Sequence, residues 1–393
     1  MNPFKYGKEV SGYQFYDRRK SCDDLHRKMV DGSTNVVLFA PRRYGKTSLV
    51  LKVLKRLHDE DGMLGMLFDM NKVPTLEQFC ETYANAVYAL VGGRRELLHK
   101  VMDYLVHLHP TFSLSAEGVP TIRLDFGERM TALSISEVLD LPEKLSRDLG
   151  DRPLTIAFDE FQEVGCLSDE FPLEKIFRSC IQAHRNVRYV FLGSKTHLMK
   201  RMFGDRSRAF YKSALPMPLD KPPVEESLEF VVSRFADCGL VASSAVAESI
   251  LDVSENIPYY LQAISSFVYE AATSAQRTEI EAGDVKAAVE LMVKLNAPIY
   301  TTFLQSVSAS QQTLLRALAE EPVAVFDDSY RLRHRLPVSS TVHSALKSLV
   351  NDGTVEQRDG RYRIEDPMLI RYLLSSPATI FKFQGANIER QKQ

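Results

Sequence analysis

The sequence has little net charge, few cysteines and no long apolar run. Its 49 lysines and arginines nearly balance 51 aspartates and glutamates, and the net charge of −2 argues against a general polyanion-binding surface. The five cysteines are scattered, and no two have the spacing of metal ligands, so we expect free thiols in a reducing compartment. No apolar run approaches a membrane span, and the first residues lack an apolar signal core. These absences predict a cytoplasmic protein with no membrane partner.

What the sequence does have is length and an ordinary globular composition. At 393 residues, with 45% apolar and 25% charged residues, it is too long for one core and predicts two or three domains. No internal repeat is present, and the only low-complexity stretch is a polar tail at 387–393.

Residues 36–54 combine a strand, a loop and a helix. The apolar run Val36–Phe39 predicts a strand buried on both faces, and Gly45-Lys46-Thr47-Ser48 begins an amphipathic helix. This order is typical of a phosphate-binding P-loop. The loop that we expect to surround a polyphosphate comprises Ala40, Pro41, Arg42, Arg43, Tyr44, Gly45, Lys46, Thr47 and Ser48.

The residue types at four loop positions suit phosphate binding for physical reasons. Gly45 lets the backbone approach a phosphate without a Cβ in the way. Lys46 would reach the β- and γ-phosphates of ATP, and the Thr47 hydroxyl would bind Mg²⁺. Ala40 replaces the first glycine of the pattern and is small enough to keep the loop.

A second apolar strand, residues 154–158, ends in two adjacent carboxylates. Asp159 at the strand tip can complete the Mg²⁺ site of Thr47. Glu160 is placed to orient and polarise an attacking water, which hydrolysis needs and binding alone does not. The alternative is the solvated start of a loop, since strands often end in acids.

A third strand, residues 187–193, ends at Ser194, which is a candidate sensor beside the γ-phosphate. The alternative is a helix N-cap for residues 198–203. The following stretch contains three arginines, Arg201, Arg206 and Arg208, any of which can act as an arginine finger in the same or a neighbouring subunit. A homo-oligomer is therefore a candidate assembly.

The N-terminal third contains several further expected elements. The stretch at 13–19 mixes aromatics with arginines, and these residues either pack on an adenine or cover a sheet edge. A short helix is expected at 23–30 and a strand at 63–70. Helices are expected from Thr75 to Leu90, at about 94–108 and at 134–149, with an irregular or hairpin-like insertion at 110–128.

The C-terminal half divides into two parts. Four prolines at 216–223 predict a stiff connector that ends the sheet domain, followed by helices at 224–237, 243–254, 258–274 and 282–294. Beyond these, helices at 310–318 and 339–350 and two strands around Asp359-Gly360 predict a winged helix.

The charge of the winged helix bears on DNA binding. Residues 308–374 carry nine basic and nine acidic side chains, and the second helix offers only His343 and Lys347. The wing carries Arg358, Arg361 and Arg363. This balance favours a protein or intramolecular contact and leaves DNA as an open alternative.

Several motifs together resemble those of the archaeal-type ATPase family, a branch of AAA+ and STAND-related P-loop proteins near the origin-recognition initiator ATPases. The motifs, in chain order, are NPFKYGKEVSGYQFYDRR, APRRYGKTSLV, IAFDEFQEV, FLGSKTHLMKRMF, Phe210-Tyr211 and IPYYLQAI. The resemblance implies an α/β P-loop domain, a helical lid and a C-terminal winged helix. It places the adenine-side arginine at Arg18 and the lid motif at Asn256-Ile257-Pro258, without its glycine.

A lid helix over the nucleotide would bring Pro258 close to the base, whereas the alternative is ordinary bundle core. We therefore predict an AAA+-like α/β domain at 1–218, a lid at 219–297 and a winged helix at 298–386. The predicted function is a Mg²⁺-dependent ATPase that binds ATP and ADP and acts as a nucleotide-driven switch. The alternative is a DNA-binding regulator with a weak or structural ATP site. Phosphotransfer to a small molecule is disfavoured, because the acid pair suits water activation.

Overall fold

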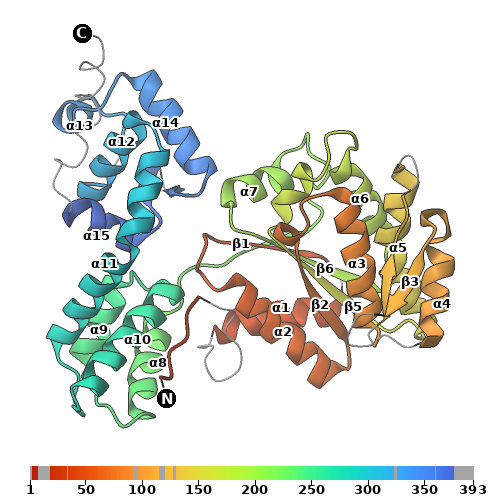
Figure 1. Ribbon diagram of the computed structural model, residues 1–393, viewed down its shortest axis with the longest axis horizontal. Coiled ribbons are helices and arrows are strands. Elements are labelled where there is room, and N and C mark those ends of the chain that lie inside the picture. Colours follow the sequence, from red (N-terminus) through yellow and green to blue (C-terminus); the bar gives the residue numbers. More distant parts are fainter. Residues whose placement is uncertain are drawn as a thin grey trace. The chain divides into compact units, whose positions relative to one another are not determined.

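The computed structural model of the protein describes residues 2–7, 18–32, 34–92, 95–114, 120–126, 130–322, 325–358 and 360–375. The chain forms two compact units (Figure 1). The sheet unit comprises Lys8–Lys221, and the helical unit combines Met1–Gly7 with Pro222–Gln393. The aromatic stretch at 13–17 lies outside the described residues, as do Asp359 and residues 376–393. None of the helices in the described part of the chain has the length and apolarity that crossing a membrane requires.

Five parallel strands form the centre of the sheet unit, in the order β2-β5-β6-β1-β7. Their bounds are β1 Val36–Phe39, β2 Leu64–Asp69, β5 Leu154–Asp159, β6 Val187–Gly193 and β7 Leu215–Pro218. Every residue of β5 is buried, as its continuous apolar run predicts. Because the strands are parallel, β1, β5 and β6 all end at the same edge of the sheet. That edge therefore collects the loop at 40–48, the acid pair and Ser194.

Helices cover the two faces of this sheet (Figure 1). They are α1 Arg19–Asp31, α2 Lys46–Asp61, α3 Leu76–Leu90, α4 Arg95–Tyr104, α5 Ala132–Asp148, α6 Leu173–Ala183 and α7 Thr196–Gly204. Helices α1 and α2 pack together, while α3, α5 and α6 pack against one another over a core of aromatic side chains. In that core Phe158 stacks between Tyr83 and Tyr189, at centroid distances of 5.7 and 6.1 Å.

The connector that the prolines at 216–223 predicted begins later than expected, because the first two prolines belong to strand β7. Pro216 and Pro218 lie in an edge strand, paired with Val37 and Phe39 of β1. Proline lacks the N–H that an inner strand must donate, so it is tolerated only at such an edge. The connector therefore begins after Pro218.

The insertion at 110–128, for which an irregular or hairpin-like structure was expected, contains a hairpin. Strands β3 Thr111–Leu114 and β4 Pro120–Arg123 pair antiparallel. The Asn85 side chain of α3 holds the hairpin by donating to the Ile122 carbonyl at 2.7 Å and accepting from the Ile122 N–H at 2.8 Å.

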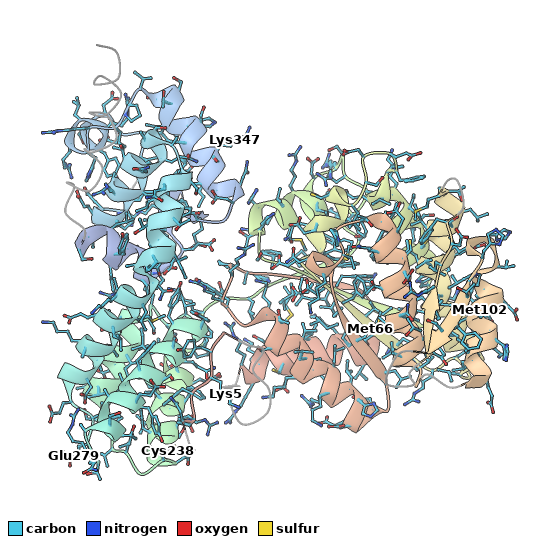
Figure 2. The ribbon with its side chains drawn as sticks, in the orientation of Figure 1. Lys5, Met66, Met102, Cys238, Glu279 and Lys347 are labelled. Carbon is cyan, nitrogen blue, oxygen red and sulfur yellow. The ribbon has the colours of Figure 1, made fainter. Side chains whose placement is uncertain are left out.

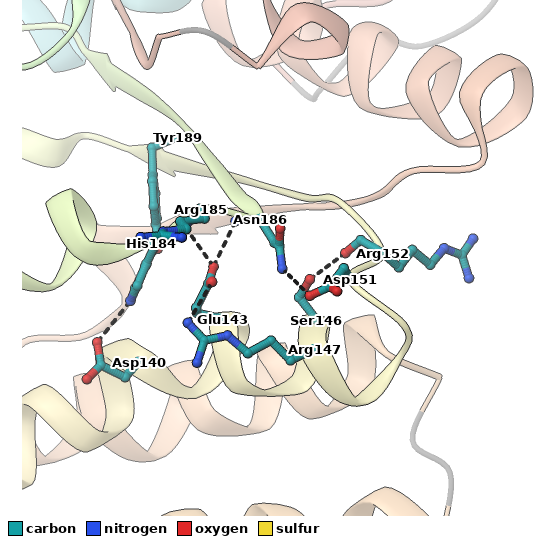
Figure 3. Close-up of polar contacts among 10 residues, drawn as sticks. All are labelled: Asp140, Glu143, Ser146, Arg147, Asp151, Arg152, His184, Arg185, Asn186 and Tyr189. Carbon is teal, nitrogen blue, oxygen red and sulfur yellow. Dashed lines mark hydrogen bonds and ion pairs between the residues drawn. The ribbon is translucent and has the colours of Figure 1, made fainter.

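Polar contacts hold helix α5 to the turn before β6, at the end of the strands opposite the candidate site (Figure 3). Glu143 of α5, which is only 4% exposed, accepts hydrogen bonds from the backbone N–H groups of Arg185 and Asn186 at 3.1 and 2.9 Å. His184 joins Asp140, at 2.9 Å, to the Tyr189 hydroxyl, at 2.7 Å. These contacts fix the turn that leads into β6.

In the helical unit, the N-terminal segment at residues 2–7 packs on a bundle of four helices. The helices are α8 Val224–Ala236, α9 Ser244–Val253, α10 Pro258–Ser274 and α11 Ala282–Ser306. Phe4 is buried against Phe235 at 4.7 Å between ring centroids, and the backbone N–H of Lys5 donates to the Gln262 side chain at 3.1 Å (Figure 2). The domain prediction placed residues 1–218 together, whereas residues 2–7 pack on this bundle.

Helix α11 is longer than predicted. It was expected to end at Lys294 but continues through Pro298 to Ser306. Tyr300 and Leu304 in the added part are buried, and Tyr300 packs on Tyr372 at 5.4 Å between centroids. This packing outweighs the hydrogen bond that Pro298 cannot donate.

The winged helix follows on the same unit. Its elements are α12 Ala309–Glu320, α13 Asp328–Arg333, α14 Ser339–Asn351, β8 Val355–Arg358, β9 Arg361–Ile364 and α15 Pro367–Ser375. The two main helices and the two-stranded wing were predicted, and α13 and α15 were not. Lys347 lies on the exposed side of α14 (Figure 2).

Candidate functional site

The loop at residues 40–45 joins β1 to α2. Gly45 has φ 82°, in the left-handed region, immediately before α2 begins at Lys46. Lys46 is only 6% exposed, and its ammonium group donates to the carbonyls of Ala40 and Pro41 at 2.8 and 2.9 Å. Arg42 and Arg43 are exposed, Tyr44 is buried and Ser48 is half-buried.

Thr47 and Asp159 meet at the edge where β1 and β5 end. The Thr47 hydroxyl donates to Oδ2 of Asp159 at 2.6 Å. The other carboxylate oxygen of Asp159 accepts the Glu160 N–H at 2.9 Å. The hydroxyl and the carboxylate that were predicted to share a cation therefore lie in direct contact.

Glu160 turns away from this pair, toward the end of β6. Its backbone is left-handed, with φ 51° and ψ 43°, an uncommon conformation for a residue other than glycine. One oxygen, Oε2, accepts from the Ser194 N–H at 3.1 Å, the Ser194 hydroxyl at 2.7 Å and the Gln162 amide at 2.5 Å. The structure thus brings Glu160 and the candidate sensor Ser194 together.

The pKa values of the two neighbouring acids are shifted in opposite directions. Burial raises the pKa of Asp159 more than the hydrogen bond from Thr47 lowers it. Burial also acts against the charge of Glu160, but hydrogen bonds from Gln162 and Ser194 and the positive charge of Lys46 together lower its pKa. The site therefore favours the ionised form of Glu160 more than that of Asp159.

Two residues that were not predicted support this arrangement. Gln162 also donates to Glu163 at 3.3 Å, and Lys195 forms an ion pair with the same Glu163 oxygen at 2.9 Å. Gly193, the last residue of β6, has no room for a Cβ, which would lie 2.5 Å from the Gln162 side-chain oxygen. The sequence signal for Gln162 is only its place two residues after Glu160.

Arg18 is buried and connects two backbone segments. Its guanidinium donates to the Tyr44 carbonyl in the loop at 2.8 Å and to the Asp220 carbonyl beyond β7. Arg18 therefore contacts the loop from the side of the connector to the helical unit. The adenine contact that the resemblance implies for it remains a prediction.

The three candidate finger arginines have different surroundings. Arg208 forms an ion pair with both carboxylate oxygens of Glu174, with Nε at 3.0 Å from Oε2. Arg201 and Arg206 are exposed. A finger role suits the two exposed arginines better, because Arg208 would first have to leave Glu174.

In the helical unit, Asn256 takes the place of the glycine that the lid motif lacks. Its φ is 54°, and asparagine tolerates this region better than most residues. The buried side chain donates to the Pro222 carbonyl at 2.8 Å and accepts from the Ser227 hydroxyl at 2.7 Å. Pro258 is the first residue of α10 and is half-buried. Its proposed contact with the base remains a prediction.

The wing packs on the same segment. Arg363 of β9 forms an ion pair with Glu255 at 2.7 Å, and Glu255 also has a positive φ, of 52°. Arg371 reaches the Val253 carbonyl at 3.4 Å. One of the three wing arginines is therefore engaged within the unit, Arg361 is exposed, and the Arg358 side chain lies outside the described part of the structure.

Comparison with known proteins supports the fold. Residues 298–375 match the family model of a probable winged helix domain. No curated protein matches the sequence. The chain is similar to the Walker-type ATPase paby2304 of Pyrococcus abyssi, with a TM-score of 0.66 and 18% identity over 95% of this chain and 99% of that one. It is also similar to the Aeropyrum pernix ORC2 protein in its ADPNP–ADP complexes, with a TM-score of 0.54 and 17% identity over 91% and 92%.

These likenesses confirm the predicted fold class, an AAA+-like parallel sheet with helices and a C-terminal winged helix. They also confirm the resemblance to P-loop ATPases near the origin-recognition proteins, at the level of the fold.

Proposed function

We propose that the chain is a Mg²⁺-dependent ATP hydrolase that acts as a nucleotide-driven conformational switch. The observation that carries this proposal is the meeting of four groups at one sheet edge. Lys46 and Thr47 follow β1, Asp159 and Glu160 end β5, and Thr47 touches Asp159 at 2.6 Å. The similarity to a Walker-type ATPase and to an ORC2 protein in ADPNP–ADP complexes agrees with a nucleotide ligand.

The loop would bind the phosphates of ATP through its backbone. N–H groups at the start of α2 would donate to a bound anion, and the left-handed Gly45 would leave the approach free of a side chain. The Lys46 ammonium would exchange its two carbonyl partners for phosphate oxygens. Since these carbonyls are neutral, a polyphosphate is the stronger partner.

The donor set at the strand ends fits Mg²⁺. This cation prefers oxygen ligands, and the site offers a hydroxyl and a carboxylate in direct contact. Thr47 and Asp159 would hold the ion, which when bound neutralises charge on the β- and γ-phosphates. Binding a cation would also favour the ionised form of Asp159, which burial disfavours in its absence.

Glu160 would orient and polarise the attacking water. A carboxylate with a lowered pKa is ionised at neutral pH, as this task requires. Its oxygen Oε2 is engaged by Ser194 and Gln162, and this contact fixes the side chain beside a candidate γ-phosphate sensor. Exposed Arg201 and Arg206 are candidates for completing the site of a neighbouring copy.

Contacts on both sides of the connector support the switch. In the sheet unit Arg18 links the loop to the Asp220 carbonyl, and in the helical unit Asn256 holds the Pro222 carbonyl. Only Lys221 separates these two anchored residues. A shift of the loop on binding nucleotide would therefore act on the connector through Arg18.

A second candidate function is a DNA-binding regulator with a weak or structural ATP site. The match to a winged helix domain favours it, because this motif can place a helix in a DNA groove. Exposed Lys347 and Arg361 would supply phosphate contacts, whereas Arg363 is occupied by Glu255. The balanced charge of residues 308–374 offers little long-range attraction to DNA.

Phosphate release from ATP distinguishes the two functions. We expect Mg²⁺-dependent turnover that EDTA abolishes and duplex DNA leaves unchanged, measured at several protein concentrations. A turnover number that rises with protein concentration would place part of the site on a second copy. The regulator function would instead give negligible turnover together with DNA affinity.

A further inference from the structure

The helical unit contains a groove that is separate from the proposed ATP site. It has a volume of about 810 Å³ and lies between α9, α11 and α15. Its lining on α11 runs from residue 282 to 297, a length of about 22 Å at 1.5 Å per residue. Three valines at helical spacing, Val285, Val289 and Val293, form its apolar floor.

The groove has a basic rim. Lys286 and Lys294 line it from the exposed side of α11, and Arg371 lines it from α15, against one acid, Glu290. Within the described residues neither lysine forms an ion pair. Arg371 Nε is buried and has no hydrogen-bond partner among the described residues. Two lysines and an arginine against one acid make the rim suited to an anionic partner.

The shape and charge of the groove disfavour two kinds of occupant. An apolar floor does not suit a nucleic acid backbone, which needs charged and stacking contacts. The chain's own residues 376–393 follow Ser375, a lining residue of the groove, in the sequence, but they carry Lys382, Arg390 and Lys392 against Glu389 alone. Their charge has the same sign as the rim and disfavours them as occupant.

We propose that this groove binds an acidic amphipathic helix of a partner protein. Such a helix presents apolar side chains at i, i+3, i+4 and i+7, which match an apolar floor of this length. Glutamates or aspartates beside that stripe would reach Lys286, Lys294 and Arg371. The site does not depend on the proposed ATPase activity.

Fluorescence polarisation with synthetic peptides tests this proposal on the full chain. The probe is a labelled helical peptide of about 18 residues with a leucine stripe flanked by glutamates, long enough to cover the groove. One control peptide carries lysines in place of the glutamates, and another has the same composition with the stripe scrambled. We expect saturable binding of the acidic peptide only, weakened by salt because exposed charges are screened.

A charge reversal locates the contact. Lys286→Glu with Lys294→Glu changes two exposed side chains, so the fold should persist, as circular dichroism can verify. We expect the double variant to lose at least about tenfold in affinity for the acidic peptide and to gain affinity for the lysine peptide. Lys347→Glu, an exposed lysine on α14, is the matched control and should change nothing.

Three results would overturn the proposal. The first is no binding of the acidic peptide, and the second is binding that the charge reversal leaves unchanged. The third is binding that appears only in a variant ending at Ser375, because the groove would then be covered by the chain's own residues 376–393.

Discussion

The Thr47 hydroxyl donates a 2.6 Å hydrogen bond to the Asp159 carboxylate, although 112 positions separate the two residues in the chain. The parallel sheet makes this contact, because β1 and β5 end at the same edge with only β6 between them. The pair belongs to the proposed Mg²⁺ site, and in the chain Lys46 directly precedes Thr47 while Glu160 directly follows Asp159.

Replacing Lys46 should weaken ATP binding. Lys46→Ala removes the charge that would face the β- and γ-phosphates, so we expect calorimetry to show a loss in affinity of at least about tenfold, equivalent to 1.4 kcal/mol. Lys55→Ala is the matched control on the same helix, since Lys55 is exposed and pairs with Asp59. An unchanged affinity in Lys46→Ala would contradict the P-loop assignment.

Asp159→Asn should stabilise the nucleotide-free fold and weaken the binding of ATP. Burial raises the pKa of Asp159, so its charge destabilises the nucleotide-free fold at pH values above that pKa, and the penalty disappears as the pH falls and the group is protonated. The amide can keep both contacts of the carboxylate, because its oxygen can accept from the Glu160 N–H while its NH₂ group donates to the Thr47 hydroxyl. We expect the variant to unfold at a higher temperature than the wild type at pH 8, with a difference that shrinks toward pH 4.

The same variant should lose Mg²⁺-dependent ATP affinity, because the carboxylate that holds the cation is gone. Asp169→Asn, at an exposed position of the same loop region, serves as the control and should leave both the unfolding temperature and the affinity unchanged. A lower unfolding temperature for Asp159→Asn at pH 8 would mean that the carboxylate stabilises the fold.

Thiol labelling should separate the cysteines by burial. Cys166 is exposed and should react with a thiol reagent first at neutral pH. Cys80 is buried, and burial raises its pKa to about 12, so it should react only after unfolding. Cys166→Ser should remove the fast phase, and rapid labelling of Cys80 in the native protein would contradict the packing of α3.

Duplex DNA should bind weakly at physiological salt. The winged helix is balanced in charge, and Arg363 is paired with Glu255. We expect a gel-shift titration of the wild type to show no salt-steep affinity. Changing Arg358, Arg361 and Arg363 together to Ala should instead alter ATP turnover or self-association.

DNA binding through the wing would give the opposite result. If the wing binds phosphates, the wild type will bind duplex tightly at low salt, and the triple variant will flatten the log–log salt dependence by up to about three. Glu255→Ala provides a matched test, because it frees Arg363 and would then strengthen the binding.

Much of the sheet unit and its edge could be predicted from the sequence. The strands β1, β5 and β6 are mostly apolar, and each leads into residues of the site, so local pattern and function coincide. Strand β7 was not predicted, because Pro216 and Pro218 indicate a connector unless the edge position is known. Helix α11 was predicted too short, because its later part depends on packing against Tyr372.

The contacts that organise the site had no local signal. Arg18 reaches the Asp220 carbonyl across 202 positions, and the burial of its guanidinium depends on where β7 ends. Gln162 engages Glu160 only because residues 161–166 form a short 3₁₀ helix after a left-handed Glu160. Such contacts follow from the folded backbone and not from the order of residues.

The most direct test of the ATPase is to measure ATP binding and phosphate release on one preparation of Glu160→Gln. The change keeps size and hydrogen bonding but removes the charge that polarises water. ATP should still bind while turnover falls by about 10²-fold or more, and Glu163→Gln, which loses its ion pair with Lys195, should turn over much as the wild type does. Near wild-type turnover in Glu160→Gln, with the loss in Glu163→Gln instead, would contradict the role assigned to Glu160.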